Sequence, residues 1–255
     1  MIHAGLAAYL IVCPLVLVGG FVDAIAGGGG FFTLTAYLLA GLPVHNAIAT
    51  NKLSSSMGTT MAVIQYVRKG FIPWRLTFFC LPASLLGAFA GARLALSVSD
   101  VAFRWFMVAI LPVAAFHVLR QKNLDGGKPL SELPFGRTAF VCALIALAFG
   151  VYDGFYGPGT GTFLLLLFTG LARLELRTAA GSAKLCNYAT NLASLAVYLT
   201  SGNVVLLLGL TAGCFSLLGN YLGTRSFFKA GSRLARPMVL LVLIVFLIKL
   251  LSELL

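Results

Sequence analysis

The sequence predicts an all-α membrane protein, a polytopic helical bundle made of two repeats that enter the membrane in opposite orientations. Three observations predict it: the composition, recurring apolar stretches and an internal repeat. Hydrophobic residues make up 60% of the 255 residues and charged residues only 10%, against roughly a quarter charged in a soluble domain. Apolar stretches of about 20 residues recur along the chain, which is the length needed to cross a hydrocarbon core of about 30 Å.

The internal repeat relates two glycine-rich motifs and the segments that follow them. Asp23 leads into the glycine run 27–30, and Asp153 leads into the run 157–161. After a slip of two residues the register holds at an offset of 132, where Lys52 matches Lys184. Further matches at this offset include paired glycines, tyrosines and arginines. The repeat therefore divides the chain into a first transmembrane half (1–119), a connector (120–135) and a second half (136–255).

Each half contains five apolar segments, and an odd number places the second half upside down relative to the first. Loop charge agrees, because the basic loop 68–75 matches the uncharged turn 201–203, and the nearly neutral turn 97–100 matches the basic loop 225–236. The positive-inside rule then places the basic loops and the connector in the cytoplasm and both termini outside a bacterial-type plasma membrane. The predicted segments are 5–26, 31–42, 46–67, 76–97 and 101–119, then 136–153, 162–172, 178–200, 204–226 and 234–252.

Sidedness is the same whether the segments before Leu42 and before Arg173 are full spans or re-entrant pairs, because both options return the chain to the same side. The net charge of +11 follows from basic loops, so nucleic acid is not expected as a partner. No Gly-rich loop precedes a Lys-Ser or Lys-Thr pair, and the cysteines and histidines lack metal-ligand spacing. We therefore expect no cofactor and no metal, and transport driven by a gradient or by another chain.

Lys52 and Lys184 lie about six residues inside predicted helices, roughly 10 Å into the hydrocarbon, where a lysine costs about 2.5–3.5 kcal/mol. Polar side chains accompany each lysine at helical spacing and form a stripe on one helix face. Inversion brings the two stripes together near the midplane, which predicts an anion site. The alternative is that each lysine reaches an interface or forms a permanent ion pair with Asp23 or Asp153. The stripes contain Ser55, Ser56 and Thr59 in the first half and Asn187, Tyr188 and Asn191 in the second.

The glycine runs interrupt the apolar segments. Unwound backbone in a membrane is tolerated where it is buried in protein or lines a cavity, so Gly28, Gly29, Gly159 and Gly161 are candidates to offer N–H donors to an anion at the start of a half-helix. Close helix packing is the alternative explanation for these glycines, and it is the favoured one for the pairs 87/91 and 219/223. The aspartates before the breaks could pair with the lysines, cap the broken helices or bind a coupling proton.

The motif 23–30, followed by Ala49-Thr50-Asn51-Lys52-Leu53, resembles the TauE/SafE family of sulfite exporters, also called 4-toluene sulfonate uptake permeases. The run 152–161, followed by Ala183-Lys184-Leu185, resembles the same family. The resemblance spans nearly the whole chain and is nearest to the YfcA-like branch. It implies transport of sulfur-containing anions, such as sulfite or organosulfonates, in either direction.

The sequence thus predicts a secondary transporter, not an enzyme, that moves a small anion by alternating access as a monomer or homodimer among membrane lipids. The rival hypothesis is a membrane-embedded sulfur-handling enzyme that uses Cys186. Asp23 and Asp153 are assigned to coupling or ion pairing. The predicted substrate-binding residues are Lys52, Lys184, Asn51, Ser55, Asn187, Asn191, Gly28, Gly29, Gly159 and Gly161.

Overall fold

The computed structural model describes residues 5–99, 127–231, 233–235, 237–242 and 244. Within these ranges all regular structure is helical apart from one isolated bridge between Lys128 and Leu174, so the all-α prediction is confirmed. The helices are α1 (Leu6–Ala26), α2 (Gly30–Leu39), α3 (Val44–Arg68), α4 (Trp74–Ser97), a short 3-10 helix (Leu130–Glu132), α6 (Phe135–Phe155), α7 (Thr160–Gly170), α8 (Leu176–Thr200) and α9 (Leu206–Ala230).

Eight of the ten predicted segments correspond to these helices within a few residues. The predicted segment 101–119 lies outside the described residues. Those residues of 234–252 that the structure describes are helical. Four helices, α1, α4, α6 and α9, are long and apolar enough to cross a membrane by length and composition. Helices α3 and α8 are as long as α9, at 25 residues each, but they carry the polar stripes.

The glycine-rich motifs end one helix and start a shorter one in each half. Helix α1 ends at Gly27, which adopts a left-handed conformation with φ of 75°, and α7 follows Gly159, whose φ is 84°. Helices α2 and α7 contain 10 and 11 residues, so each is about 15 Å long, half the thickness of a hydrocarbon core. Both are therefore half-helices whose N-terminal ends start inside the bundle.

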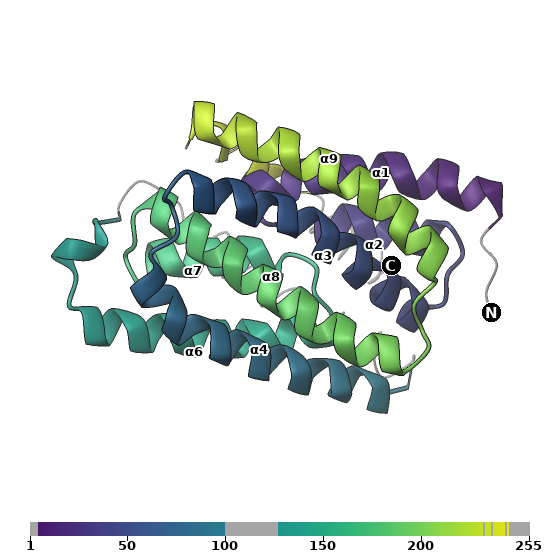
Figure 1. Cartoon of the computed structure of the whole chain (residues 1–255), viewed down its shortest axis with the longest axis horizontal. Coiled ribbons are helices and arrows are strands. Elements are labelled where there is room, and N and C mark those ends of the chain that lie inside the picture. Colours follow the sequence, from purple (N-terminus) through teal and green to yellow (C-terminus); the bar gives the residue numbers. More distant parts are fainter. Residues whose placement is uncertain (1–4, 100–126, 232, 236, 243, 245–255) are drawn as a thin grey trace.

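Helix α1 packs against α9, and α4 packs against α6 (Figure 1). A side chain at Gly87 or Gly91 would collide with the carbonyl oxygens of Leu147 and Val151 of α6, respectively. At the equivalent positions of α9, Gly219 and Gly223 meet the carbonyl oxygens of Leu17 and Phe21 of α1 in the same way. These glycines serve close helix packing, as the sequence predicted, and the two helix pairs repeat the same contact.

Helices α3 and α8 pack against each other in antiparallel directions in the middle of the bundle (Figure 1). At one end the Asn46 amide donates to the Asn203 carbonyl at 2.8 Å, and at the other end Gly181 lies against the main chain of Phe71. In Figure 1, α1 and α6 also run in opposite directions along the long axis. The inversion of the two halves across a membrane stays a prediction, and these directions are compatible with it.

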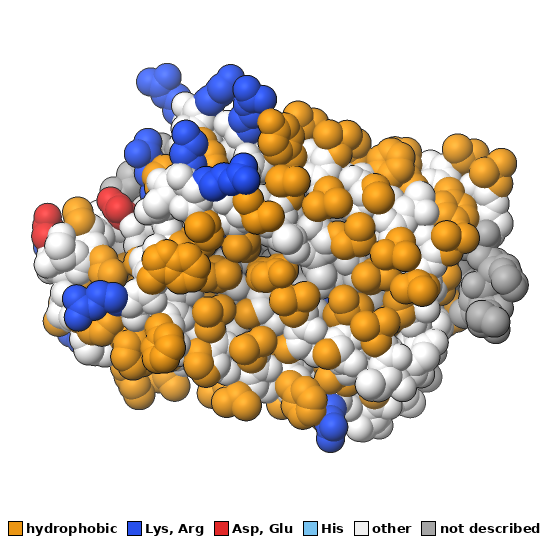
Figure 2. Space-filling view, viewed as in Figure 1, with side chains coloured by type: hydrophobic (Ala, Val, Ile, Leu, Met, Phe, Trp, Pro, Cys, Tyr) orange, Lys and Arg blue, Asp and Glu red, His pale blue; other side chains and the backbone are white. Residues whose placement is uncertain are grey.

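Large apolar side chains cover the middle of the visible surface, and Lys and Arg gather at the end where α3 passes to α4 and α9 ends (Figure 2). This distribution is typical of a lipid-facing belt with one basic rim. The exposed apolar residues include Leu10 and Val18 of α1, Phe78, Leu86 and Phe89 of α4, Phe140 and Leu144 of α6, and Leu207 and Leu218 of α9.

Candidate functional site

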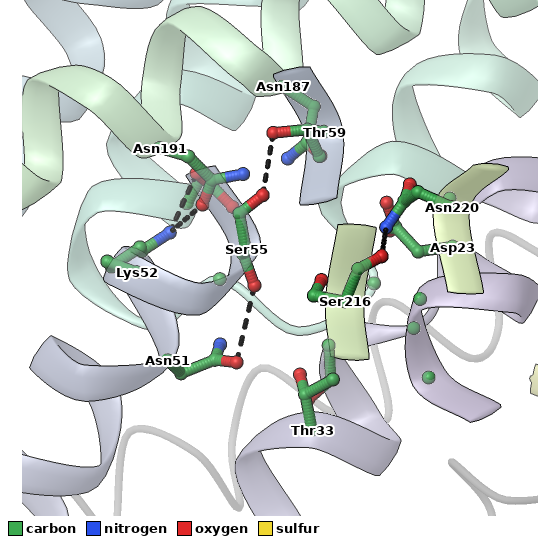
Figure 3. A pocket seen from close by; sticks show the side chains of 18 residues that line it. Asp23, Thr33, Asn51, Lys52, Ser55, Thr59, Asn187, Asn191, Ser216 and Asn220 are labelled. Atoms are coloured by element: carbon green, nitrogen blue, oxygen red, sulfur yellow. Dashed lines mark hydrogen bonds and ion pairs between the residues drawn. The ribbon is translucent and has the colours of Figure 1, made fainter. Parts of the chain in front are cut away.

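A polar pocket lies between the glycine breaks and the middle of α3 and α8 (Figure 3). Its cavity volume is about 30 Å³, which is room for about two water molecules. Nine of the predicted site and coupling residues line it: Asp23, Gly29, Asn51, Lys52, Ser55, Asp153, Gly159, Asn187 and Asn191. The other lining residues are Gly19, Gly20, Gly27, Gly30, Thr33, Thr59, Gly157, Ser216 and Asn220.

Each intramembrane lysine forms an ion pair with the aspartate of the other half. Lys52 Nζ lies 2.8 Å from Asp153 Oδ2 and donates to Asn191 Oδ1 at 3.3 Å. Lys184 Nζ lies 2.8 Å from Asp23 Oδ2 and donates to the Asp23 carbonyl at 2.6 Å. Both lysines are buried, at 1% and 4% exposure, so neither extends to an interface. Of the alternatives drawn from the sequence, pairing with the aspartates is the one that the structure adopts.

The crossed pairs change the electrostatics expected of the site. Two lysines and two aspartates sum to no net charge, so the lysines do not form an uncompensated positive centre. Lys52 still lines the pocket, and its two hydrogen bonds leave one ammonium hydrogen for a ligand. The pocket therefore offers a charged donor without a net positive charge.

Amide and hydroxyl groups of α3 and α8 surround the Lys52 ammonium. Ser55 donates to Asn51 Oδ1 at 3.3 Å, which leaves the amide nitrogen of Asn51 as a donor for a ligand. Asn187 and Asn191 approach from α8 (Figure 3). We name this side of the pocket, formed by Lys52, Asn51, Ser55, Asn187 and Asn191, the donor side.

The opposite side of the pocket is formed by α1 and α9, with Asp23, Ser216 and Asn220 close together (Figure 3). The sequence-based prediction missed Ser216 and Asn220. The signal was present, because Ser216, Asn220 and Thr224 recur every four residues in an otherwise apolar segment, which places them on one helix face. We name this side the acceptor side.

Three predicted site residues do not line this pocket. Lys184 and Gly161 line a second, smaller cavity of about 10 Å³, together with Asp23 and Tyr66. Asp23 therefore contributes to both cavities. Gly28 packs against Val242 and the hydroxyl of Thr162. Gly161 also lies against Gly27, so the two glycine breaks contact each other in the centre of the molecule.

The rival hypothesis required a reactive Cys186 in the site. Cys186 is fully buried beside Cys80 and does not line the pocket. Within the described part of the chain, no group of His, Cys, Asp and Glu residues could hold a metal ion. The structure thus has a cavity lined by charged and amide groups at two helix breaks.

Comparison with known proteins gives a consistent result. Residues 12–250 match the family model described as sulfite exporter TauE/SafE. A "probable membrane transporter protein" of Haemophilus influenzae is 35% identical over 88% of this chain and 87% of its own length. A Sinorhizobium protein, "probable membrane transporter protein ORF9", is 33% identical over 97% of this chain and 93% of its own length.

The Escherichia coli K12 protein named "probable membrane transporter protein YfcA" is 32% identical over 93% of this chain and 87% of its own length. No solved structure matches the chain significantly. The names of these relatives indicate a membrane transporter and not an enzyme. The chain belongs to the TauE/SafE family of membrane transporters.

Proposed function

We propose that this protein is a secondary transporter of small sulfur-containing oxyanions, such as sulfite or short organosulfonates, in the bacterial inner membrane. The observation that carries the proposal is the buried ammonium of Lys52 at a polar pocket between two broken helices. A buried ammonium with an unused hydrogen-bond donor is energetically unfavourable, and such residues inside a membrane usually have a function. The description of the family as sulfite exporters supports the choice of anion.

The donor side supplies the chemistry that an oxyanion needs. The oxygens of the oxyanion would accept hydrogen bonds from the Lys52 ammonium and from the amide groups of Asn51, Asn187 and Asn191. The Ser55 hydroxyl would add one further donor. The N-terminal ends of α2 and α7 start at Gly29 and Gly159, which have no side-chain caps, so first-turn N–H groups and the helix dipole favour an anion there. The small cavity favours compact anions over sulfonates with long tails.

The proposal includes alternating access, which the predicted inverted repeat supports. The side chains of the Lys52–Asp153 pair are each 2% exposed, whereas Asp23 of the other pair is 15% exposed. If the halves are inverted repeats that exchange conformations, the two pairs exchange environments as well. Lys184 would then contact the anion in the state that opens to the other side, which gives both lysines a role in one transport cycle.

A binding and flux screen of the purified protein tests this proposal. Sulfite, thiosulfate, sulfoacetate, sulfate and longer sulfonates are compared in proteoliposomes, and we expect the compact sulfur oxyanions to bind and move. Lys52→Ala and Lys184→Ala should abolish transport, while Lys69→Ala, in an exposed loop, should not. Normal transport in both intramembrane variants would refute the proposal.

A further inference from the structure

Asn220, which lines the pocket, carries a buried side-chain oxygen without a hydrogen-bond partner among the described residues. The residue is 1% exposed, and its amide nitrogen donates to the Ser216 carbonyl at 3.1 Å. Among the described residues, Asn220 Oδ1 has no hydrogen-bond partner. The carbonyl fixes the orientation of the amide, because rotating it would place two oxygens against each other. Leaving a buried acceptor without a hydrogen bond is unfavourable, so this oxygen favours a positively charged or hydrogen-bond-donating ligand.

The surroundings of Asn220 are built to accommodate its amide. Side chains at Gly20 of α1 or Gly58 of α3 would collide with Asn220 Nδ2 or with Ser216. Asp23 lies beside it in the last turn of α1 (Figure 3), where the negative end of the helix dipole favours a cation. Lys184 engages the Oδ2 atom of Asp23, which leaves Oδ1 for a second ligand.

The α4–α6 pair, which is the repeat equivalent of the α1–α9 pair, carries different residues at two of the corresponding positions. Gly19, which lines the pocket, matches Phe149, and Asn220 matches Ala88. The Phe149 ring packs against Phe163 and Tyr152, with centroids 5.4 and 6.0 Å away. An aromatic ring therefore stands in the α4–α6 pair where Gly19 lines the pocket in the α1–α9 pair. The acceptor side therefore belongs to the α1–α9 pair, and the α4–α6 pair, which is its repeat equivalent, does not reproduce it.

Charge balance supplies an independent argument. The four charged residues around the two cavities, Lys52, Asp153, Lys184 and Asp23, already neutralise one another. A singly charged anion, such as hydrogen sulfite or a sulfonate, that enters alone would leave one uncompensated negative charge in a buried site, which is strongly unfavourable. A cation that enters with the anion removes this penalty.

We propose that the acceptor side, formed by Asp23, Ser216 and Asn220, binds a small monovalent cation that is transported together with the anion. This inference rests on the proposed function. The coupling ion is a positive charge bound by oxygen acceptors, and it is either a sodium ion or a proton. Within the described part of the chain, the ionisable groups that face Asp23 are Lys184 of α8 and Tyr66 of α3, with the Lys52–Asp153 pair lining the same pocket.

The test measures sulfite affinity of the purified full-length chain by titration calorimetry. One arm replaces sodium by choline at constant pH, and the other compares acidic and alkaline pH without sodium. We expect one of these cations to tighten sulfite binding by about tenfold or more, and sulfite to tighten binding of that cation by the same factor, because linkage is reciprocal. In Asn220→Ala and in Ser216→Ala, the cation should change sulfite affinity by less than about twofold, which corresponds to a coupling free energy below about 0.4 kcal/mol.

The repeat provides a matched control. Ser84 occupies the position equivalent to Ser216 and is also buried, with no hydrogen-bond partner for its hydroxyl within the described residues, but it does not line the pocket. Ser84→Ala should keep the full cation effect. Alanine already occupies the position equivalent to Asn220, at Ala88, which supports folding of Asn220→Ala. If that variant fails to fold, Ser216→Ala and its control Ser84→Ala provide a second test.

The outcomes separate the two proposals. Sulfite binding that depends on neither sodium nor pH overturns the coupling inference and leaves the proposed function intact. A cation effect that persists in Asn220→Ala and Ser216→Ala overturns the assignment to the acceptor side. Absence of binding of any sulfur oxyanion under all conditions refutes the proposed function, and the coupling inference with it.

Discussion

Asp153→Asn removes the carboxylate that neutralises Lys52 and keeps the shape of the side chain. Lys52 is 1% exposed, and breaking one partner of a buried ion pair destabilises a protein by about 3–5 kcal/mol. If Lys52 binds the transported anion, sulfite can replace the missing carboxylate. At a concentration of about 100 times its Kd, sulfite should then restore about 2.7 kcal/mol. The variant should therefore be unstable alone and largely rescued by its substrate.

The assay is chemical unfolding in detergent with and without sulfite, combined with titration calorimetry. Sulfite should bind more tightly to Asp153→Asn than to the wild type and should depend less on a coupling cation, because the neutralising carboxylate is gone. Glu175→Gln is the control, since Glu175 is an exposed carboxylate that accepts a hydrogen bond from the Thr178 hydroxyl at 2.8 Å. It should change neither stability nor sulfite affinity appreciably.

A double variant separates stability from binding. Lys52→Met combined with Asp153→Leu replaces the pair with apolar residues of similar volume, which is often neutral or stabilising for a buried pair. We expect this variant to be about as stable as the wild type but unable to bind sulfite. The reasoning is refuted if sulfite fails to stabilise Asp153→Asn, or if the double variant still binds sulfite normally.

Three further predictions concern packing, chemistry and orientation. Gly91→Ala should lower the free energy of unfolding by about 1–3 kcal/mol, because the methyl group collides with the Val151 carbonyl, whereas Gly136→Ala, with open space around it, should be neutral in the same unfolding assay. A variant without cysteines should still transport sulfite in a flux assay, and loss of flux with the fold intact would favour the enzyme hypothesis. In that background, Ser201→Cys should react with an impermeant maleimide added outside cells and Lys69→Cys should not, and the reverse pattern would contradict the predicted orientation.

The helices and their interruptions were predictable because each depends on local sequence. Apolar stretches of about 20 residues define spans, and glycine runs end helices at positions such as Gly27, whose φ is positive. The burial of Lys52 and Lys184 was also predictable, since both lie well inside apolar segments. The segment predicted at 101–119 lies outside the described residues, so the sequence remains the only guide there.

The partners of the lysines could not be predicted, because they depend on how α3 and α8 pack with α1 and α6. The sequence offered Asp23 and Asp153 as candidates but contained no information on the crossed pairing between halves. Because each lysine pairs with the aspartate of the other half, the positive and negative charges cancel. The positions of the lysines along the chain do not reveal this neutralisation. The acceptor side was missed for another reason: Ser216 and Asn220 lie in a segment whose apolar character was sufficient to identify it as a span.

Sulfite counterflow in proteoliposomes tests the central claim most directly, namely that the anion binds at Lys52 in the pocket between the broken helices. Vesicles loaded with unlabelled sulfite and containing the wild-type protein should accumulate external radiolabelled sulfite transiently. Vesicles with the equally stable Lys52→Met and Asp153→Leu double variant should accumulate none. Equal counterflow in the two preparations would contradict the account, because the anion would then cross the membrane without the ammonium on which the proposed site depends.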